Sequence, residues 1–305
     1  MKIAVLADLL RVSVLESSLV STGADASLGS TPSSTSVLWQ RGSDARVMLA
    51  AGYALLLQVA HPTVGAGVTE HSNFRRDPWG RLWRTLDFTC TMVYGGPQAA
   101  GEMGRRIRSM HSRIGGTRPD GRRYHALEPQ AYAWVHATLA EGIVAAHARF
   151  GRRFTTEECE QLWVQWRALG GLLGIGDGEL PPDWAGFRDY FAAMTRQTLE
   201  HTAAVDEVLE ALARPAPPTS ASPYRLIWPL VGLPAGRLFS LATAALLPEA
   251  LRSRLGVGWG RRQAAELSVL SGALRAATPA LPPALLVTGP GYLRWRNGGE
   301  QTPPQ

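Results

Sequence analysis

Apolar residues recur at helical spacing along most of the chain from about residue 38 onward, and no series of alternating, strand-like stretches stands out. The stretch 44–60, DARVMLAAGYALLLQVA, is apolar on almost every side, which is typical of a buried central helix, and Pro62 is expected to end it. The spacing predicts further helices over 78–94, 98–114, 128–150, 156–173 and 184–212, and shorter ones over 238–246, 249–255 and 260–276. We therefore predict an all-α fold.

Capping residues and glycines mark the ends of several of these helices. Asp77 followed by Pro78 is a typical helix start, because the aspartate accepts from free backbone N–H groups and proline suits the first position. Glycine pairs at 95–96 and 115–116 are expected to end the second and third helices. The Asp-Gly pair at 120–121 favours a short hairpin in the turn-rich stretch that follows.

Composition along the chain predicts one folded domain with loose ends. Residues 1–37 are rich in Ser, Thr, Gly and Ala toward their end and have little to bury, so we predict a disordered N-terminal segment. Residues 38–295 form the predicted all-helical globular domain, and 296–305 a loose tail. The proline-rich stretch 214–223 is a linker within that domain, because the helices after it are too short and interrupted to form a second one.

The net charge is +6 and the sequence pI about 9.8, and the positive charge comes almost entirely from arginine, since Lys2 is the only lysine. Basic tails and lysine-rich blocks are absent, so we expect no nucleic-acid partner. Two cysteines without a CxxC motif favour neither a disulfide framework nor a structural zinc site. No apolar run reaches the ~18 residues of a membrane span, so we expect a cytoplasmic protein without stable membrane insertion.

Polar side chains gather on one face of the predicted second helix. Arg81, Arg84 and Thr85 stand at i, i+3 and i+4, so they share a face, and Phe88 continues it. Two guanidinium groups and a hydroxyl suit an anionic or oxygen-rich ligand. The alternative is a solvated arginine face on an amphipathic helix.

The predicted third helix carries His111 among small and apolar positions, including Gly104 and Ile107. A histidine in such surroundings can be an axial haem ligand, because a flat macrocycle needs close backbone approach and an apolar environment. The alternative is a packed or surface histidine. His61 precedes Pro62, where a role in capping the helix C-terminus is the simplest interpretation.

Other familiar catalytic patterns are missing. HExxH, GxSxG and a phosphate-binding P-loop are all absent, and the glycines of VGAGV do not fit a dinucleotide-binding turn. Glu70, in GVTEH, could act as a base, but no neighbouring residue requires that role.

Three ordered segments resemble the MpaB-type oxygenase family, whose best-understood relatives are the latex clearing proteins, or rubber oxygenases. They are the apolar helix ending in AHP, the run EHSxFxxDPxGRLxRT and the segment YxALxPxAYxWVHAT. The resemblance covers roughly residues 40–215 well and the C-terminal helices only in general character.

The resemblance implies an all-helical fold that encloses haem b, bound through one histidine, for which His111 is the matching position. The family's distal R-x-x-K-T element corresponds to Arg81, Arg84 and Thr85, with arginine in place of lysine. A guanidinium is a poor metal donor, so Arg84 is expected to form hydrogen bonds, either to the haem propionates or to O2 opposite His111. The resemblance also makes Glu70 the nearest candidate for the family's catalytic glutamate and places Thr138 near the haem pocket.

The first hypothesis is therefore a haem-b-dependent oxygenase acting on an unsaturated hydrophobic small molecule, isoprenoid- or lipid-like. O2 and that substrate are the expected partners, and a homodimer is left open. A non-enzymatic haem or apolar-ligand binding protein of the same fold is the alternative. A basic helical module that docks on anionic membrane or nucleic acid is a third, weaker one.

Overall fold

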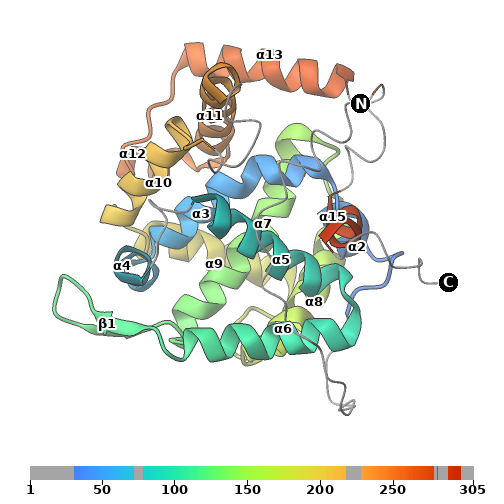
Figure 1. Cartoon of the computed structure of the whole chain (residues 1–305), viewed down its shortest axis with the longest axis vertical. Coiled ribbons are helices and arrows are strands. Elements are labelled where there is room, and N and C mark those ends of the chain that lie inside the picture. Colours follow the sequence, from blue (N-terminus) through green and yellow to red (C-terminus); the bar gives the residue numbers. More distant parts are fainter. Residues whose placement is uncertain (1–30, 72–77, 218–227, 278–279, 281–287, 297–305) are drawn as a thin grey trace.

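The computed structural model describes residues 31–71, 78–217, 228–277, 280 and 288–296. Helices make up most of this structure, and Figure 1 shows them packed around α7 (Pro129–Phe150), with one short hairpin extending from the side. The prediction of an all-α fold is confirmed. The predicted N-terminal segment and C-terminal tail lie mostly outside the described residues.

The predicted central helix over 44–60 is two elements: a 3-10 helix, η1 (Ala45–Ala50), and α3 (Ala51–Val59). A short helix, α2 (Val37–Gly42), precedes them, and the Ser36 side chain caps it by accepting from the Trp39 N–H. Pro62 ends α3 as predicted, but it also starts a helix that the sequence analysis missed, α4 (Pro62–His71). The axis bends by 102° between η1–α3 and α4. Proline suits the first position of α4, because the N–H that it lacks would have no helical partner there.

Helices α5 (Pro78–Tyr94) and α6 (Gly96–His111) form an antiparallel hairpin that turns at Gly95 and Gly96. Gly96 has φ +82°, which L residues with side chains rarely adopt. After α6, β1 (Gly115–Thr117) pairs antiparallel with β2 (Arg123–His125), with Gly116 opposite Tyr124. Both the helix turn and the hairpin are where the sequence predicted them. The proposed capping residue Asp77 lies outside the described residues.

The central helix α7 and α8 (Thr156–Leu172) match their predicted bounds within a residue or two. The single helix predicted over 184–212 is wrong: α9 (Trp184–Gln197) and α10 (Ala203–Ala213) are separated by a break. A backbone N–H and a side-chain hydroxyl in this break bind the end of α3. The Glu200 N–H donates to the Ala60 carbonyl at 2.9 Å, and the Thr202 hydroxyl donates to the Val59 carbonyl at 2.7 Å. These long-range bonds replace helical ones, which periodicity alone does not reveal.

The C-terminal part contains α11 (Trp228–Leu246), α12 (Glu249–Arg254), α13 (Arg261–Ala277) and α15 (Gly289–Arg296). Helix α11 begins ten residues before the predicted start at 238, because it continues through Pro234. The sequence did not predict α15, which packs along α5.

Polar and steric contacts fix α15 on α5. The Asp87 carboxylate accepts from the Tyr292 hydroxyl and from Arg296 at 2.9 and 3.0 Å. Burial opposes ionisation of Asp87, but the hydrogen bonds from Arg296 and Tyr292 outweigh it and lower its pKa. A Cβ on Gly289 would lie 2.1 Å from the Tyr94 ring, so only glycine allows this approach. Helix α5 is thus clamped between α6 and α15.

The core lies where α3 and α7 run antiparallel, with α8 and α9 behind them. Trp134, fully buried, donates from its indole to the Leu57 carbonyl at 2.8 Å. A smaller cluster around Phe150 and Leu241 joins η1, α7, α11 and α13. Among the described residues, no single helix is long and apolar enough to cross a membrane; η1–α3 together with α4 passes that test only as a sharply bent pair.

Candidate functional site

The predicted site residues on α5 and α6 lie at the same end of the helical hairpin. Arg81, Arg84 and Thr85 are near the start of α5 and His111 is the last residue of α6, so both groups lie far from the shared turn. Figure 1 shows the two helices separating from that turn toward α4 and the β hairpin. The candidate site is therefore the region between these two helix ends, beside the start of α7.

His111 is held in one tautomer. Its Nδ1 lies 2.8 Å from the Ile107 carbonyl, which can only accept, so Nδ1 carries the proton. Burial lowers the pKa of His111, and the bond to the carbonyl partly opposes this. The ring is therefore neutral at physiological pH, with the Nε2 lone pair available. A neutral imidazole whose other nitrogen donates to a carbonyl is the usual state of a metal-ligating histidine.

An apolar surface extends from His111 along two helices. On α6, Met103, Ile107 and His111 follow one another at i, i+4 and i+8 and are all half-buried. On α7, Tyr132 and Leu139 are half-buried although most of that helix is buried. The two stripes meet where the His111 and Tyr132 rings contact edge-on, 5.5 Å between centroids. This arrangement suits a flat apolar group beside the histidine.

Among the described residues, no three histidine, cysteine or acidic side chains are grouped to hold a metal ion by themselves. One histidine can nevertheless hold an iron whose remaining ligands come from a macrocycle. The neutral His111 ring and its apolar surroundings fit that requirement.

Of the three residues predicted to form one polar face on α5, one is half-buried and two are exposed. Arg81 is half-buried, and burial together with the nearby Arg84 charge lowers its pKa. Arg84 and Thr85 are exposed. The Thr85 hydroxyl donates to the Arg81 carbonyl at 3.0 Å, which satisfies it within its own helix. Phe88 turns inward and packs against the core.

Glu70, at the end of α4, is half-exposed and bound to the β hairpin. Its Oε2 accepts a hydrogen bond of 2.6 Å from the Tyr124 hydroxyl. The next residue, His71, lies with Nε2 3.2 Å from the Gly115 carbonyl. The carboxylate of Glu70 therefore has a structural partner, which the sequence analysis did not identify.

Thr138 is fully buried between α3 and α7. Its hydroxyl donates to the Val135 carbonyl at 2.7 Å and accepts from the Gln58 amide at 3.0 Å. Both hydrogen-bonding roles of the hydroxyl are occupied by protein groups.

His61 is 3% exposed, and neither ring nitrogen has a hydrogen-bond partner. Burial, and to a smaller degree the charge of Arg118, lowers its pKa to about 4. The interpretation of His61 as a helix cap is therefore wrong for its side chain. The carbonyls at the end of α3 are capped instead by Trp134, Glu200 and Thr202.

A second buried ionisable group lies deeper along α7. Glu141 is bound by Arg188 of α9 at 3.0 Å and lies 3.4 Å from the Tyr53 hydroxyl of α3. Burial raises the pKa of Glu141 to about 7, although Arg188 and Tyr53 act in the opposite direction. Nothing in the sequence pattern singled out this acid, because its partners come from two distant helices.

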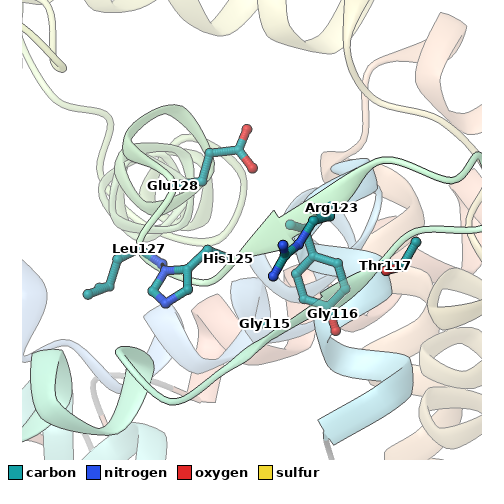
Figure 2. A pocket seen from close by; sticks show the side chains of 8 residues that line it. Gly115, Gly116, Thr117, Arg123, His125, Leu127 and Glu128 are labelled. Atoms are coloured by element: carbon teal, nitrogen blue, oxygen red, sulfur yellow. Dashed lines mark hydrogen bonds between the residues drawn. The ribbon is translucent and has the colours of Figure 1, made fainter.

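A surface pocket of about 740 Å³ lies beside the β hairpin and the start of α7, as Figure 2 shows. Arg123, His125 and Glu128 line it, and the Thr63 hydroxyl donates to Glu128 at 3.2 Å. The His125 ring accepts from the Leu127 N–H and donates to the Ser112 carbonyl. None of the site residues predicted from the sequence lines this pocket.

Comparison with known proteins identifies relatives for most of the chain. Residues 39–276 match the family described as the catalytic domain of ER-bound oxygenase mpaB/B′ and rubber oxygenase. Two similar proteins, from Mycobacterium bovis and Mycobacterium tuberculosis and both described as uncharacterized, are 25% identical over 239 residues. These alignments cover 77% of this chain and 90% of each relative. No solved structure shows a significant match.

Proposed function

The chain belongs to the family of MpaB-type oxygenases and rubber oxygenases and is therefore an oxygenase, and on that premise we propose that it depends on haem b. Its substrate in this proposal is an unsaturated hydrophobic small molecule, isoprenoid- or lipid-like. The observation that carries the proposal is the neutral His111 ring, whose Nδ1 is fixed by Ile107, beside the apolar stripes of α6 and α7.

In this proposal His111 holds the haem iron through Nε2. When bound, haem supplies the oxidative chemistry with O2, which no protein side chain can perform alone. The bond from Nδ1 to the Ile107 carbonyl fixes the tautomer and the ring orientation. Tyr132 supports the ring from α7, and the neighbouring apolar side chains exclude water and accommodate a hydrophobic substrate.

The arginines of α5 provide the polar end of the same site. Arg81 and Arg84 are one turn apart and carry permanent charges, which suits the haem propionates or hydrogen bonds to O2. Arg81 is half-buried, so water competes less strongly for the hydrogen bonds of its guanidinium group.

A haemin titration tests the ligand. We expect the wild-type protein to bind one haem and show a Soret band, and His111→Ala to lose most of that binding while keeping its helical circular dichroism. Added imidazole should restore haem binding to His111→Gly, since it can enter the space that the side chain leaves.

His201→Ala is the matched control, because His201 is exposed and paired with Asp206 at 2.8 Å on α10. This variant should bind haem as the wild type does. Unchanged haem content and spectrum in His111→Ala would refute the ligand assignment. Turnover of an alkene under O2 by the loaded protein separates an oxygenase from a protein that only binds haem.

A further inference from the structure

The end of α4 is tied to the β hairpin by a set of contacts that we call the hairpin latch: Glu70 and His71 on α4, and Tyr124, Gly115 and Gly116 on the hairpin. Its main bond is the one from the Tyr124 hydroxyl to Glu70, 2.6 Å long. Tyr124 is 5% exposed. Burial and the bond to Glu70 raise the pKa of Tyr124 to about 12, so the phenol stays protonated and donates. A bond from a hydroxyl to a carboxylate is among the stronger kinds in proteins.

Gly116, beside this bond, has no room for a side chain. A Cβ on Gly116 would lie 2.3 Å from Oε2 of Glu70 and 2.8 Å from the Tyr124 oxygen. A Cβ on Gly67 of α4 would touch the Tyr124 ring at 3.4 Å. The backbone therefore approaches the pair closely on the hairpin side.

The latch lies next to the segment that carries His111. Strand β1 begins four residues after His111. Between them, the Ser112 carbonyl accepts from the His125 ring at 3.2 Å, and the Ile114 carbonyl accepts from the Ala126 N–H at 3.0 Å. Both donors belong to the strand, or its continuation, that also carries Tyr124. Contacts that fix Tyr124 against α4 therefore also fix the position of the end of α6.

We propose that Glu70 is a positioning residue: by accepting the hydrogen bond of Tyr124 it fixes the hairpin, and with it the end of α6 that carries His111, against α4. The haem-binding part of this inference rests on the proposed function. Glu70 then needs only an acceptor oxygen, not a charge or a transferable proton. This role differs from the catalytic one that the family resemblance implies for Glu70.

The variants separate these two roles. Glu70→Gln keeps an acceptor oxygen for Tyr124, whereas Glu70→Ala and Tyr124→Phe each remove the bond. The double variant Glu70→Ala/Tyr124→Phe measures whether the two residues act together. Thr63→Val is the matched control, because it removes a hydroxyl bond between α4 and Glu128 that does not involve the hairpin.

The first measurement is amide hydrogen exchange over residues 112–117 in the protein as purified, which does not need haem. We expect exchange there to rise about tenfold in Glu70→Ala, in Tyr124→Phe and in the double variant alike, which is the factor for losing about one strong hydrogen bond. Glu70→Gln and Thr63→Val should stay within about threefold of the wild type. The haemin dissociation constant should rise in the three variants that lose the bond and stay near the wild-type value in Glu70→Gln and Thr63→Val.

Several results would overturn the inference. One is Glu70→Gln with normal exchange and normal haem but no alkene turnover, since that makes Glu70 a proton-transfer group. Another is a double variant whose increase in exchange rate equals the product of the increases in the two single variants, since that means Glu70 and Tyr124 act independently. Failure of the wild type to bind haemin would refute the proposed function instead, and the exchange series would still decide the role of the latch.

Discussion

Helix α6 approaches the end of α8 so closely that Gly104 cannot be enlarged without moving one of them. A Cβ on Gly104 would lie 2.3 Å from the Leu172 carbonyl oxygen and 3.0 Å from its carbon. Ordinary contact begins at 3.4 Å, so Gly104→Ala needs a separation of about 1 Å between two backbones. Backbone atoms cannot rotate away as a flexible side chain can.

The free energy of unfolding should fall as a result. Overpacking costs about 1–3 kcal/mol, and a 2.3 Å approach to backbone atoms belongs in the upper part of that range, about 2–3 kcal/mol. The better helix propensity of alanine returns about 1 kcal/mol. The net loss is about 1–2 kcal/mol, which lowers Tm by roughly 2–8 °C for a domain of this size. His111 lies seven residues further along the same helix, so the displacement should also weaken haemin binding.

Gly171→Ala provides the control. Gly171 lies near the end of α8, and a Cβ there would meet no atom within 4 Å. This variant should keep or slightly raise Tm and leave haemin affinity unchanged. Thermal unfolding followed by circular dichroism and haemin titration of both variants provide the assay. A Gly104→Ala protein as stable as the wild type, with unchanged haemin affinity, would refute the reasoning.

Three further predictions concern buried and charged groups. The folded-state pKa of Glu141 is raised to about 7, so its contribution to stability is lost as pH rises from about 4.5 through 7. The Tm advantage of Glu141→Gln over the wild type should therefore grow between pH 5 and 8, and a difference independent of pH would contradict this. Burial lowers the pKa of His61 to about 4, so the unfolded chain binds a proton that the folded chain does not, and stability is lost as pH falls below about 6.5. His61→Leu should remove this penalty, about 2 kcal/mol at pH 5, and should therefore raise Tm at that pH. Arg81→Ala and Arg84→Ala should keep the fold but reduce haem retention or carbon monoxide binding. Thr85→Val should change the free energy of either binding step by no more than about 1 kcal/mol, the contribution of one hydroxyl hydrogen bond. Wild-type spectra in all three variants would remove this helix face from the site.

Elements with strong local signals were predictable from the sequence. The glycine pair at 95–96 ends α5, and the Asp-Gly pair at 120–121 makes the hairpin, with Gly121 at φ +82°. Proline at the first turn of α7 also agrees with the predicted start. Each of these signals depends on backbone preferences of a few neighbouring residues, which do not change with the rest of the fold.

Other elements were not predictable because distant partners determine them. The break between α9 and α10 exists because Glu200 and Thr202 bind carbonyls of α3, which lies about 140 residues away. Similarly, α15 depends on Asp87 and Tyr94 of α5. Local periodicity contains no information about such contacts.

The same distinction applies to the candidate site. Helical spacing correctly placed Arg81 and Thr85 on adjoining positions of one helix, but it could not show that one is half-buried and the other exposed. The bond between Glu70 and Tyr124 joins residues 54 positions apart. The glycine pair at 115–116 was predicted to end the third helix, which is wrong: α6 ends at His111, and both glycines lie in β1, where Gly116 lets the backbone approach that bond.

The clamp of α15 on α5 gives this protein a definite order of assembly. Residues 288–296 lie beyond the stretch 39–276 that matches the family, yet they hold the helix that carries Arg81 and Arg84. Asp87 precedes Tyr292 and Arg296 by about 200 residues, so these two partners are synthesised well after α5. The contacts between α5 and α15 therefore form only after residues 288–296 have been synthesised, and a cofactor that needs α5 in this position binds after that step.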